Sequence, residues 1–169
     1  KAGLPIRKVL VWDAARLPWD PKRQNTNVGI PFQYRIANTT VGGLGENLLW
    51  NGKVRIFQRD GHGSSIFLGE DETALTPVGE EIRLAMGQSR DVVVTQTKQL
   101  DEKINIRRNS SGGIVLYDTD ERMRAEVRNF KDKPVVIEVV ENIEGQWDME
   151  ESTHTFARKD SRTLVFTLT

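Results

Sequence analysis

The segment PFQYRIAN, residues 31 to 38, alternates large apolar side chains with polar ones. Phe32, Tyr34 and Ile36 fall on one side of an extended chain, and the polar residues between them fall on the other side. A spacing of two residues places side chains on one face of a β-strand, whereas a helix needs a spacing near 3.6. The segment therefore predicts a half-buried strand of an antiparallel sheet.

The same alternation recurs along the rest of the chain. It is present in GKVRIFQR at 52–59, DEKINIRR at 101–108, RAEVRNF at 124–130, PVVIEVVE at 134–141 and RTLVFTLT at 162–169. Segments rich in Gly, Asn, Asp and Ser separate many of these runs, as between the strands of sandwiches and barrels. We predict an all-β fold, an antiparallel β-sandwich of the immunoglobulin-like or a related type, with few or no helices.

The connections between these runs carry two further predictions. A strand at 122–130 is followed by a short polar turn and by a second strand that starts at Pro134, a position where strands tolerate proline. We predict that these two strands form one hairpin. The connections at 13–31 and 38–52 are long, and long loops in compact domains are either functional or mobile. They are where we expect a binding surface.

The segment FLGEDETALTPVGEEIRLAMG, residues 67 to 87, carries five carboxylates around a Thr-Pro-Val-Gly centre. A helix capped by Thr76 is one interpretation, but Gly79 stands where a capping box needs Glu. We favour two strands, at 65–71 and 80–86. Their inward residues are predicted to be Phe67, Ile82, Leu84 and Met86, with Glu81 and Arg83 on the face opposite Ile82 and Leu84.

The carboxylates of this segment also suggest a reaction centre. They are Glu70, Asp71, Glu72, Glu80 and Glu81. Paired carboxylates act as acid and base only in a pocket that separates their pKa values, and acids at a polar turn are normally solvated. The segment also lacks the order of Asp, Gly and Glu of a calcium loop. We favour a solvated connection, with a carboxylate-dependent hydrolase and a calcium-stabilised module as alternatives.

Composition excludes several classes of protein. The chain has 24 basic and 24 acidic residues and no cysteine, so disulfides and zinc-thiolate sites are impossible. Basic residues mostly alternate with apolar ones, so we predict no nucleic-acid partner. No apolar run reaches the about 18 residues of a membrane-spanning helix. His62 and His154 lie too far apart in the sequence to indicate a zinc site. We predict no metal, no cofactor and no catalytic residue.

Three of the four tryptophans lie near turns. An exposed indole can stack on a sugar or anchor a protein interface. The alternative is that these side chains close the ends of the core. We predict a binding surface formed by Trp19, Arg23, Trp50 and Trp147, and a carbohydrate-binding module is an alternative function.

Residues 30 to 168 resemble a known family. The segments YRIANTTVGGLGENLLWNGKVRIFQRD, FLGEDETALTPVGEEIRLAMGQSRDVVV and RNFKDKPVVIEVVE are similar, in order and spacing, to the C-terminal domain of unknown function of the bacterial mucoidy-inhibitor A family. The resemblance implies a sandwich-like module at the end of a longer, often exported protein with a coiled coil in its front half. It implies no catalytic residue.

We expect residues 1–169 to form a single module of a larger protein. The resemblance implies that this protein is bacterial and is exported to the periplasm or the cell surface. The family typically continues past the position of Thr169 with a final strand, so we expect an unpaired sheet edge and an edge-strand dimer. We expect a non-catalytic module that mediates protein-protein or cell-envelope association. Its partner is a protein or an envelope component.

Overall fold

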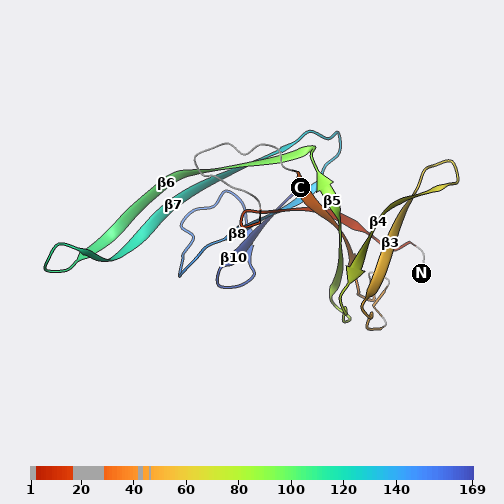
Figure 1. Cartoon of the computed structure of the whole chain (residues 1–169), viewed down its shortest axis with the longest axis horizontal. Helices are drawn as coiled ribbons and strands as arrows, with labels where there is room; N and C mark the ends of the chain where they lie inside the picture. The colour runs from red at the N-terminus through yellow and green to blue at the C-terminus, as the bar shows by residue number, and fades with distance from the viewer. Residues whose placement is uncertain (1–2, 17–28, 42–43, 46) are drawn as a thin grey trace.

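The computed structural model describes residues 3–16, 29–41, 44–45 and 47–169 of the chain. Within these residues the protein is all-β, with ten strands and no helix (Figure 1). The strands are β1 Arg7–Asp13, β2 Ile30–Ala37, β3 Gly52–Arg59, β4 Ser65–Thr73, β5 Glu81–Ser89, β6 Val92–Arg108, β7 Ile114–Asn129, β8 Val136–Asn142, β9 Phe156–Arg158 and β10 Thr163–Leu168. The predicted all-β, sandwich-like fold is confirmed.

A six-stranded sheet forms the body of the molecule, in the order β5-β2-β1-β8-β10-β9. All neighbours in it are antiparallel except β1 and β8. Leu10 pairs with Phe32 and Lys8 pairs with Tyr34, so the alternation predicted for residues 31–38 sets the faces of β2. One face is apolar, and the other carries charged side chains.

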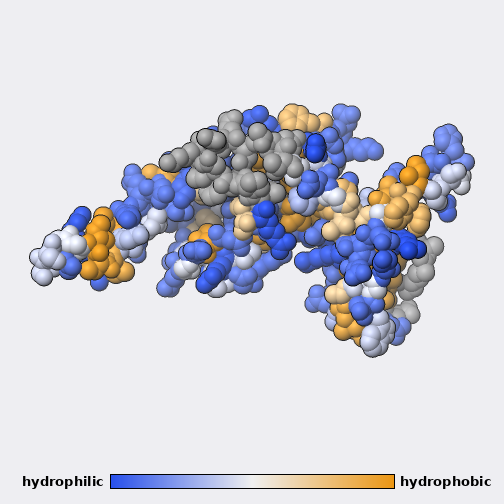
Figure 2. Space-filling view, viewed as in Figure 1, coloured by the Kyte–Doolittle hydropathy of each residue, from blue (hydrophilic) through white to orange (hydrophobic). Residues whose placement is uncertain are grey.

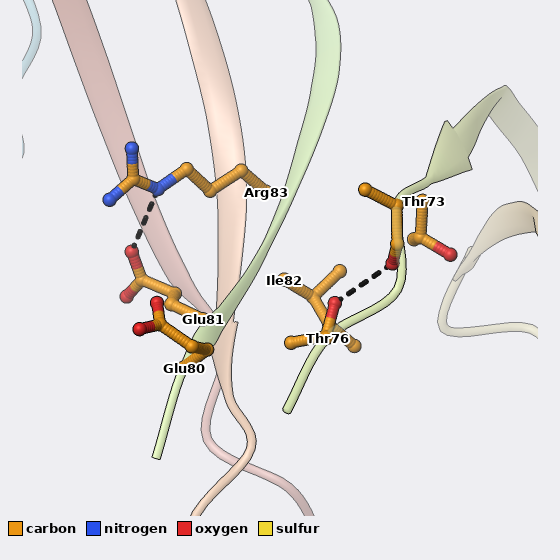
Figure 3. A pocket seen from close by; sticks show the side chains of 7 residues that line it. Thr73, Thr76, Glu80, Glu81, Ile82 and Arg83 are labelled. Carbon is orange, nitrogen blue, oxygen red and sulfur yellow. Dashed lines mark hydrogen bonds and ion pairs between the residues drawn. The ribbon is translucent and has the colours of Figure 1, made fainter. Parts of the chain in front are cut away.

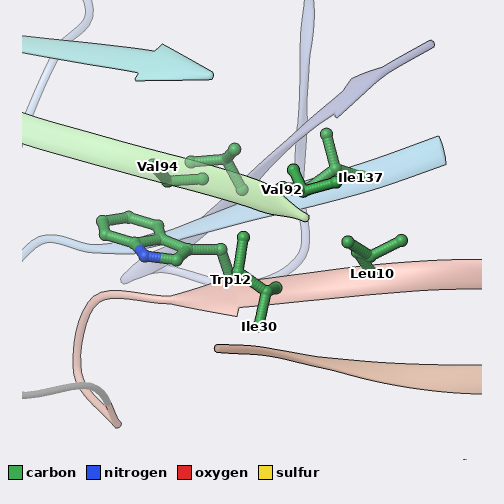
Figure 4. Close-up of a cluster of buried hydrophobic side chains, with 7 residues drawn as sticks. Leu10, Trp12, Ile30, Val92, Val94 and Ile137 are labelled. Carbon is green, nitrogen blue, oxygen red and sulfur yellow. The ribbon is translucent and has the colours of Figure 1, made fainter. Parts of the chain in front are cut away.

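The hydrophobic core lies on the apolar face of this sheet (Figure 4). The first residues of β6 cross the sheet and form the second layer of the sandwich. The buried residues of the core cluster are Leu10, Trp12, Ile30, Val92, Val94, Ile137 and Val139. At about 25 cal/mol per Å² of buried apolar surface, side chains of this size supply the main stabilising free energy of the fold. Trp12 is therefore a core residue.

Two hairpins extend from the body on opposite sides in Figure 1, and each forms a separate two-stranded sheet. One consists of β3 and β4. The other consists of β6 and β7, which pair from Val92 opposite Asn129 as far as Arg108 opposite Ile114. Every residue from 101 to 119 is exposed. The prediction of a half-buried strand at 101–108 is wrong, because among the described residues no second layer covers that part of β6.

The hairpin predicted for residues 122–141 is also wrong. The strand β7 pairs with β6, whereas β8 pairs with β1 and β10. Neighbouring residues of β8 are apolar on both faces, as in Val136-Ile137 and Val139-Val140, which suits a central strand better than an edge. The turn after β7 is instead fastened to the start of β6, since the Phe130 N–H donates to the Asp91 carbonyl oxygen at 2.8 Å.

The acidic segment forms strands, as predicted, but these strands do not pair with each other. The strand β4 pairs with β3, and β5 pairs with β2 at the edge of the large sheet. Leu84 is buried, as predicted. Glu81 and Arg83 lie together on the other face of β5, as predicted, with their charged groups 3.4 Å apart. Phe67 was predicted to point inward, but 53% of it is exposed, because its hairpin extends beyond the core.

The described part of the connection at 38–52 is held by Asn38, which is 0% exposed. Its side-chain amide donates to the carbonyl oxygens of Asn47, Thr76 and Pro77 at 3.0 to 3.2 Å. Gly45 lies against the same loop, where an added Cβ would stand 2.1 Å from the carbonyl carbon of Thr39. This end of the connection is thus a packed structure.

At the other end of the large sheet, β9 is only three residues long and pairs with Leu164, Val165 and Phe166 of β10. Strand β10 is therefore paired on both sides over these residues. A short edge strand limits pairing with further chains. Among the described residues, no helix has the length and apolar character needed to cross a membrane.

Candidate interaction surfaces

The four residues predicted to bind a partner do not form one surface in the described structure. Trp19 and Arg23 lie outside the described residues. Trp50 precedes β3 next to the bridge between Leu49 and Thr76, and it is 76% exposed. Its indole is available to solvent at the base of the β3/β4 hairpin.

Trp147 has a different environment, at the β9 edge of the sheet. Its indole N–H donates to the Ser161 carbonyl oxygen at 2.9 Å. The Arg158 guanidinium lies 4.3 Å from the centroid of its ring, and Phe156 packs against it at 6.4 Å. One ring face is thus occupied by an arginine of the same chain. Because β5 and β9 are opposite edges of the sheet, the structure does not bring Trp147 together with Trp50.

The β3/β4 hairpin carries an apolar surface that the sequence analysis did not identify. We call it the β3/β4 patch, and it consists of Phe57, Ile66, Phe67 and Leu68, all exposed (Figure 2). The rings of Phe57 and Phe67 lie 5.4 Å apart. A register shift after Ile56 brings these two rings opposite each other. Sequence alternation does not reveal such a bulge.

The base of the β3/β4 hairpin is fixed to the body. The backbone N–H of Ala85 in β5 donates to Asp71 Oδ2 at 2.6 Å, and Gly69 lies close to the end of the Met86 side chain. Glu70 binds Lys53 and Arg55 across the hairpin, at 3.2 and 3.1 Å. The hydrogen bond from Arg55 is the main cause that lowers the Glu70 pKa. The hairpin is thus held in a defined direction.

The β6/β7 hairpin carries a second exposed apolar surface near its tip (Figure 2). We call it the apolar band, and it consists of Ile104, Ile106, Ile114, Val115, Leu116 and Tyr117, which are 40–63% exposed. Large contiguous apolar patches are rare on monomeric proteins and often mark interaction sites. The two hairpins therefore present the candidate interaction surfaces of the molecule.

The charged face of the large sheet contains an ion-pair network. Arg35 is 6% exposed and donates two hydrogen bonds to Glu138, at 2.6 and 2.7 Å. Glu81 contacts Arg7, Arg35 and Arg83. The Arg35 hydrogen bonds lower the pKa of Glu138, and the same bonds raise the pKa of Arg35. Sequence alternation placed Arg35 on the polar face but could not identify a partner from β8.

A pocket of about 350 Å³ lies where the connection from β4 enters β5 (Figure 3). It is lined by Thr73, Ala74, Thr76, Glu80, Glu81, Ile82 and Arg83. Of the five carboxylates weighed as a reaction centre, only Glu80 and Glu81 line it. Glu81 is already paired with arginines, while Glu70 and Asp71 stabilise the hairpin.

The described part of the chain contains no group of three His, Cys, Asp or Glu side chains that could hold a metal ion. Comparisons with protein-family models, with curated proteins and with solved structures found no match to the chain.

Proposed function

We propose that the chain is a non-catalytic, sandwich-like module of a larger, exported bacterial protein, and that it mediates protein-protein contact through the β3/β4 hairpin. The observation that carries the proposal is the exposed aromatic pair Phe57 and Phe67. Aromatic side chains dominate the binding energy of protein interfaces. Trp50, at the base of the same hairpin, is a further aromatic anchor.

The architecture supports this role. Isolated two-stranded hairpins are marginally stable in water, so an extended hairpin that exposes apolar rings gains stability when a partner covers it. The attachment of Asp71 to β5 fixes the direction of the hairpin before binding, which reduces the ordering cost of association. The resemblance to the mucoidy-inhibitor A family supports the exported, cell-envelope setting.

The proposal is tested in the longer parent protein by site-specific photo-crosslinking in its own cells. A photoreactive residue at Phe57 or Phe67 should crosslink one discrete partner protein, whereas the same residue at the exposed Gln99 should not. The double variant Phe57→Ser with Phe67→Ser should lose the complex while it keeps the thermal unfolding midpoint of the wild type. A partner captured equally from all three positions, or from none of them, contradicts the proposal.

A carbohydrate-binding module is the second candidate, and the exposed indole of Trp50 favours it. Aromatic faces stack on sugar rings, and Trp50 offers an accessible indole. Tryptophan fluorescence titrated with envelope polysaccharides tests this candidate. A spectral shift that disappears in Trp50→Ala supports it, and an unchanged spectrum with every polysaccharide rejects it.

A further inference from the structure

We propose that the outer half of the β6/β7 hairpin is a self-association arm that binds the same arm of a second copy of this chain in antiparallel orientation. This interaction uses a different surface from the β3/β4 patch, so it goes beyond the function proposed above. Three features of the arm lead to it: exposure of apolar side chains on both faces, the separation of its charges and its backbone edges.

The first feature is the placement of apolar side chains. Ile114, Val115, Leu116 and Tyr117 are consecutive in β7. Register shifts interrupt the ladder with β6 in this stretch, but four consecutive residues of an extended strand cannot all lie on one face. Both faces of the arm therefore carry exposed apolar side chains, and the described residues bury none of them. A strand designed for water alternates apolar with polar residues, so this run indicates a surface that another molecule covers.

The second feature is the separation of charge along the arm. The tip arginines, Arg107 and Arg108, lie in the outer half of the apolar band, opposite Leu116 and Ile114, and residues 104–117 contain no carboxylate. On the body side, the paired segments 101–103 and 118–121 hold five carboxylates against one lysine, Lys103. The arm therefore has a negative base next to an apolar band whose outer half carries positive charge.

This order of charges is self-complementary in only one orientation. When two arms overlap in antiparallel orientation about a twofold axis, the two apolar bands meet. The tip arginines of each copy then lie beside the acidic base of the other copy. A parallel arrangement would bring like charges together, which is unfavourable. Twofold interfaces of this kind are isologous, which means that the same patch serves both partners.

The third feature is the backbone. Among the described strands, the arm is a single pair, so within this part of the chain both of its outer edges have ladder positions that an antiparallel strand of another copy can fill. The arm extends about 25 Å from Asp101 to Arg108 at the usual rise per residue. Overlap of two such arms covers less than the roughly 800 Å² per partner of a standard interface, so the association is weak and reversible.

A lipid surface fits the same observations less well. Inserting the apolar band would carry Arg107 and Arg108, which lie in its outer half, into the membrane with it, which is costly. The unpaired backbone groups on both edges of the arm would also enter a medium without hydrogen-bond partners. Binding to a membrane is therefore treated as an alternative outcome of the test.

The test is sedimentation of the full chain over concentrations from about 10 μM to about 1 mM, the range of weak complexes. The wild type should shift from monomer to dimer across this range. The double variant Val115→Ser with Leu116→Ser should weaken association at least tenfold, since it removes apolar groups from both faces. A wild type that stays monomeric at every concentration overturns the proposal, as does an unchanged dimer in this variant.

Charge exchange tests the orientation. One variant reverses the tip with Arg107→Glu and Arg108→Glu, and the other reverses the base with Glu102→Lys and Asp120→Lys, which are opposite each other in the hairpin. Each variant alone should associate less than the wild type, and an equal mixture should restore the dimer. Failure of the mixture to recover rejects the antiparallel arrangement.

Binding of the monomeric wild type to anionic phospholipid vesicles, lost in the Val115→Ser and Leu116→Ser variant, would assign the arm to a membrane and overturn the proposal. The outcome is independent of the β3/β4 patch, because Phe57 and Phe67 are unchanged in every variant. As a folding control, all variants should keep the cooperative unfolding of the wild type, since the substituted side chains lie outside the core.

Discussion

The inner and outer halves of the β6/β7 hairpin share one ladder of paired strands but differ in what lies beneath them. In the inner half, Val92 and Val94 are 0% and 5% exposed, because they lie on the large sheet. In the outer half, Val115 is 63% exposed, and no other strand of the described structure covers it. Backbone pairing between β6 and β7 is therefore enough to form the strands, whereas burial of their side chains requires a second layer of the structure.

The loss of an ion-pair partner should reveal the difference between buried and exposed regions most strongly. Glu138→Ala in the body leaves the buried Arg35 with its hydrogen bond to the neutral Gln33 at 3.3 Å and its longer, 3.8 Å contact to Glu81. Removing one member of a buried pair costs about 3 kcal/mol, because an uncompensated charge stays in the interior. Glu121→Ala in the outer hairpin removes an exposed partner of Lys98 and should cost less than about 1 kcal/mol.

Urea unfolding at pH 7 measures both costs, provided that the dependence of free energy on urea is unchanged between the variants. If both variants lost the same free energy of unfolding, the charged face of the sheet would not behave as a buried environment. The pair Arg35 and Glu138 would then have to be regarded as a surface ion pair.

The pH dependence of the unfolding free energy should also report burial in the body, because the body contains the partly buried carboxyl group of Glu141. The pKa of this carboxyl is raised to about 7, mainly by burial; the hydrogen bond from Gln96 acts against the shift, and the nearby Asp13 adds to it. The unfolded chain ionises the same group near pH 4.5. Between these values the folded state binds more protons, so stability falls as the pH rises from about 4.5 to about 7.

The size of the effect follows from about 1.4 kcal/mol per pKa unit, which corresponds to a loss of roughly 2 to 3 kcal/mol between pH 5 and pH 8. Glu141→Gln removes the ionisation and should remove this part of the pH dependence, so the variant becomes the more stable protein at pH 8. The measurement is urea unfolding of both proteins at several pH values. Parallel pH profiles would disprove the raised pKa.

The strands themselves were predictable from the sequence, because an alternation of two residues is a local property. Residues 31–38, 52–59 and 162–169 correspond to β2, β3 and β10. The pairing of strands was not predictable in the same way. Strand β7 pairs with β6 and not with β8, since pairing depends on which segments meet in the folded chain.

The candidate surfaces were predictable only in part. The turn position of Trp50 agreed with its exposure, but the contact of Trp147 with Arg158 joins parts of the chain that the sequence does not link. Alternation at 101–108 predicted a half-buried strand and was wrong. An apolar pattern indicates that a face can be covered, but it does not say whether the same chain covers it.

Matched valines give the smallest expected effect and test the comparison directly. Val94→Ala removes two methyl groups from the core, at about 0.8 kcal/mol for each buried carbon plus a cavity term, so it should cost about 2 kcal/mol. Val115→Ala removes the same atoms from the outer hairpin, where exposed substitutions change stability by less than about 0.5 kcal/mol. Both are measured by urea unfolding at concentrations where the chain is monomeric. The residue type is the same at the two positions, although Val94 pairs with Val127 while Val115 lies at a register shift between the pairs of Leu116 and Ile114, so the difference of about 1.5 kcal/mol mainly reports the sheet beneath Val94. A cost at Val115 as large as that at Val94 would mean that the outer hairpin is covered in the isolated chain, and the distinction between its two halves would fail.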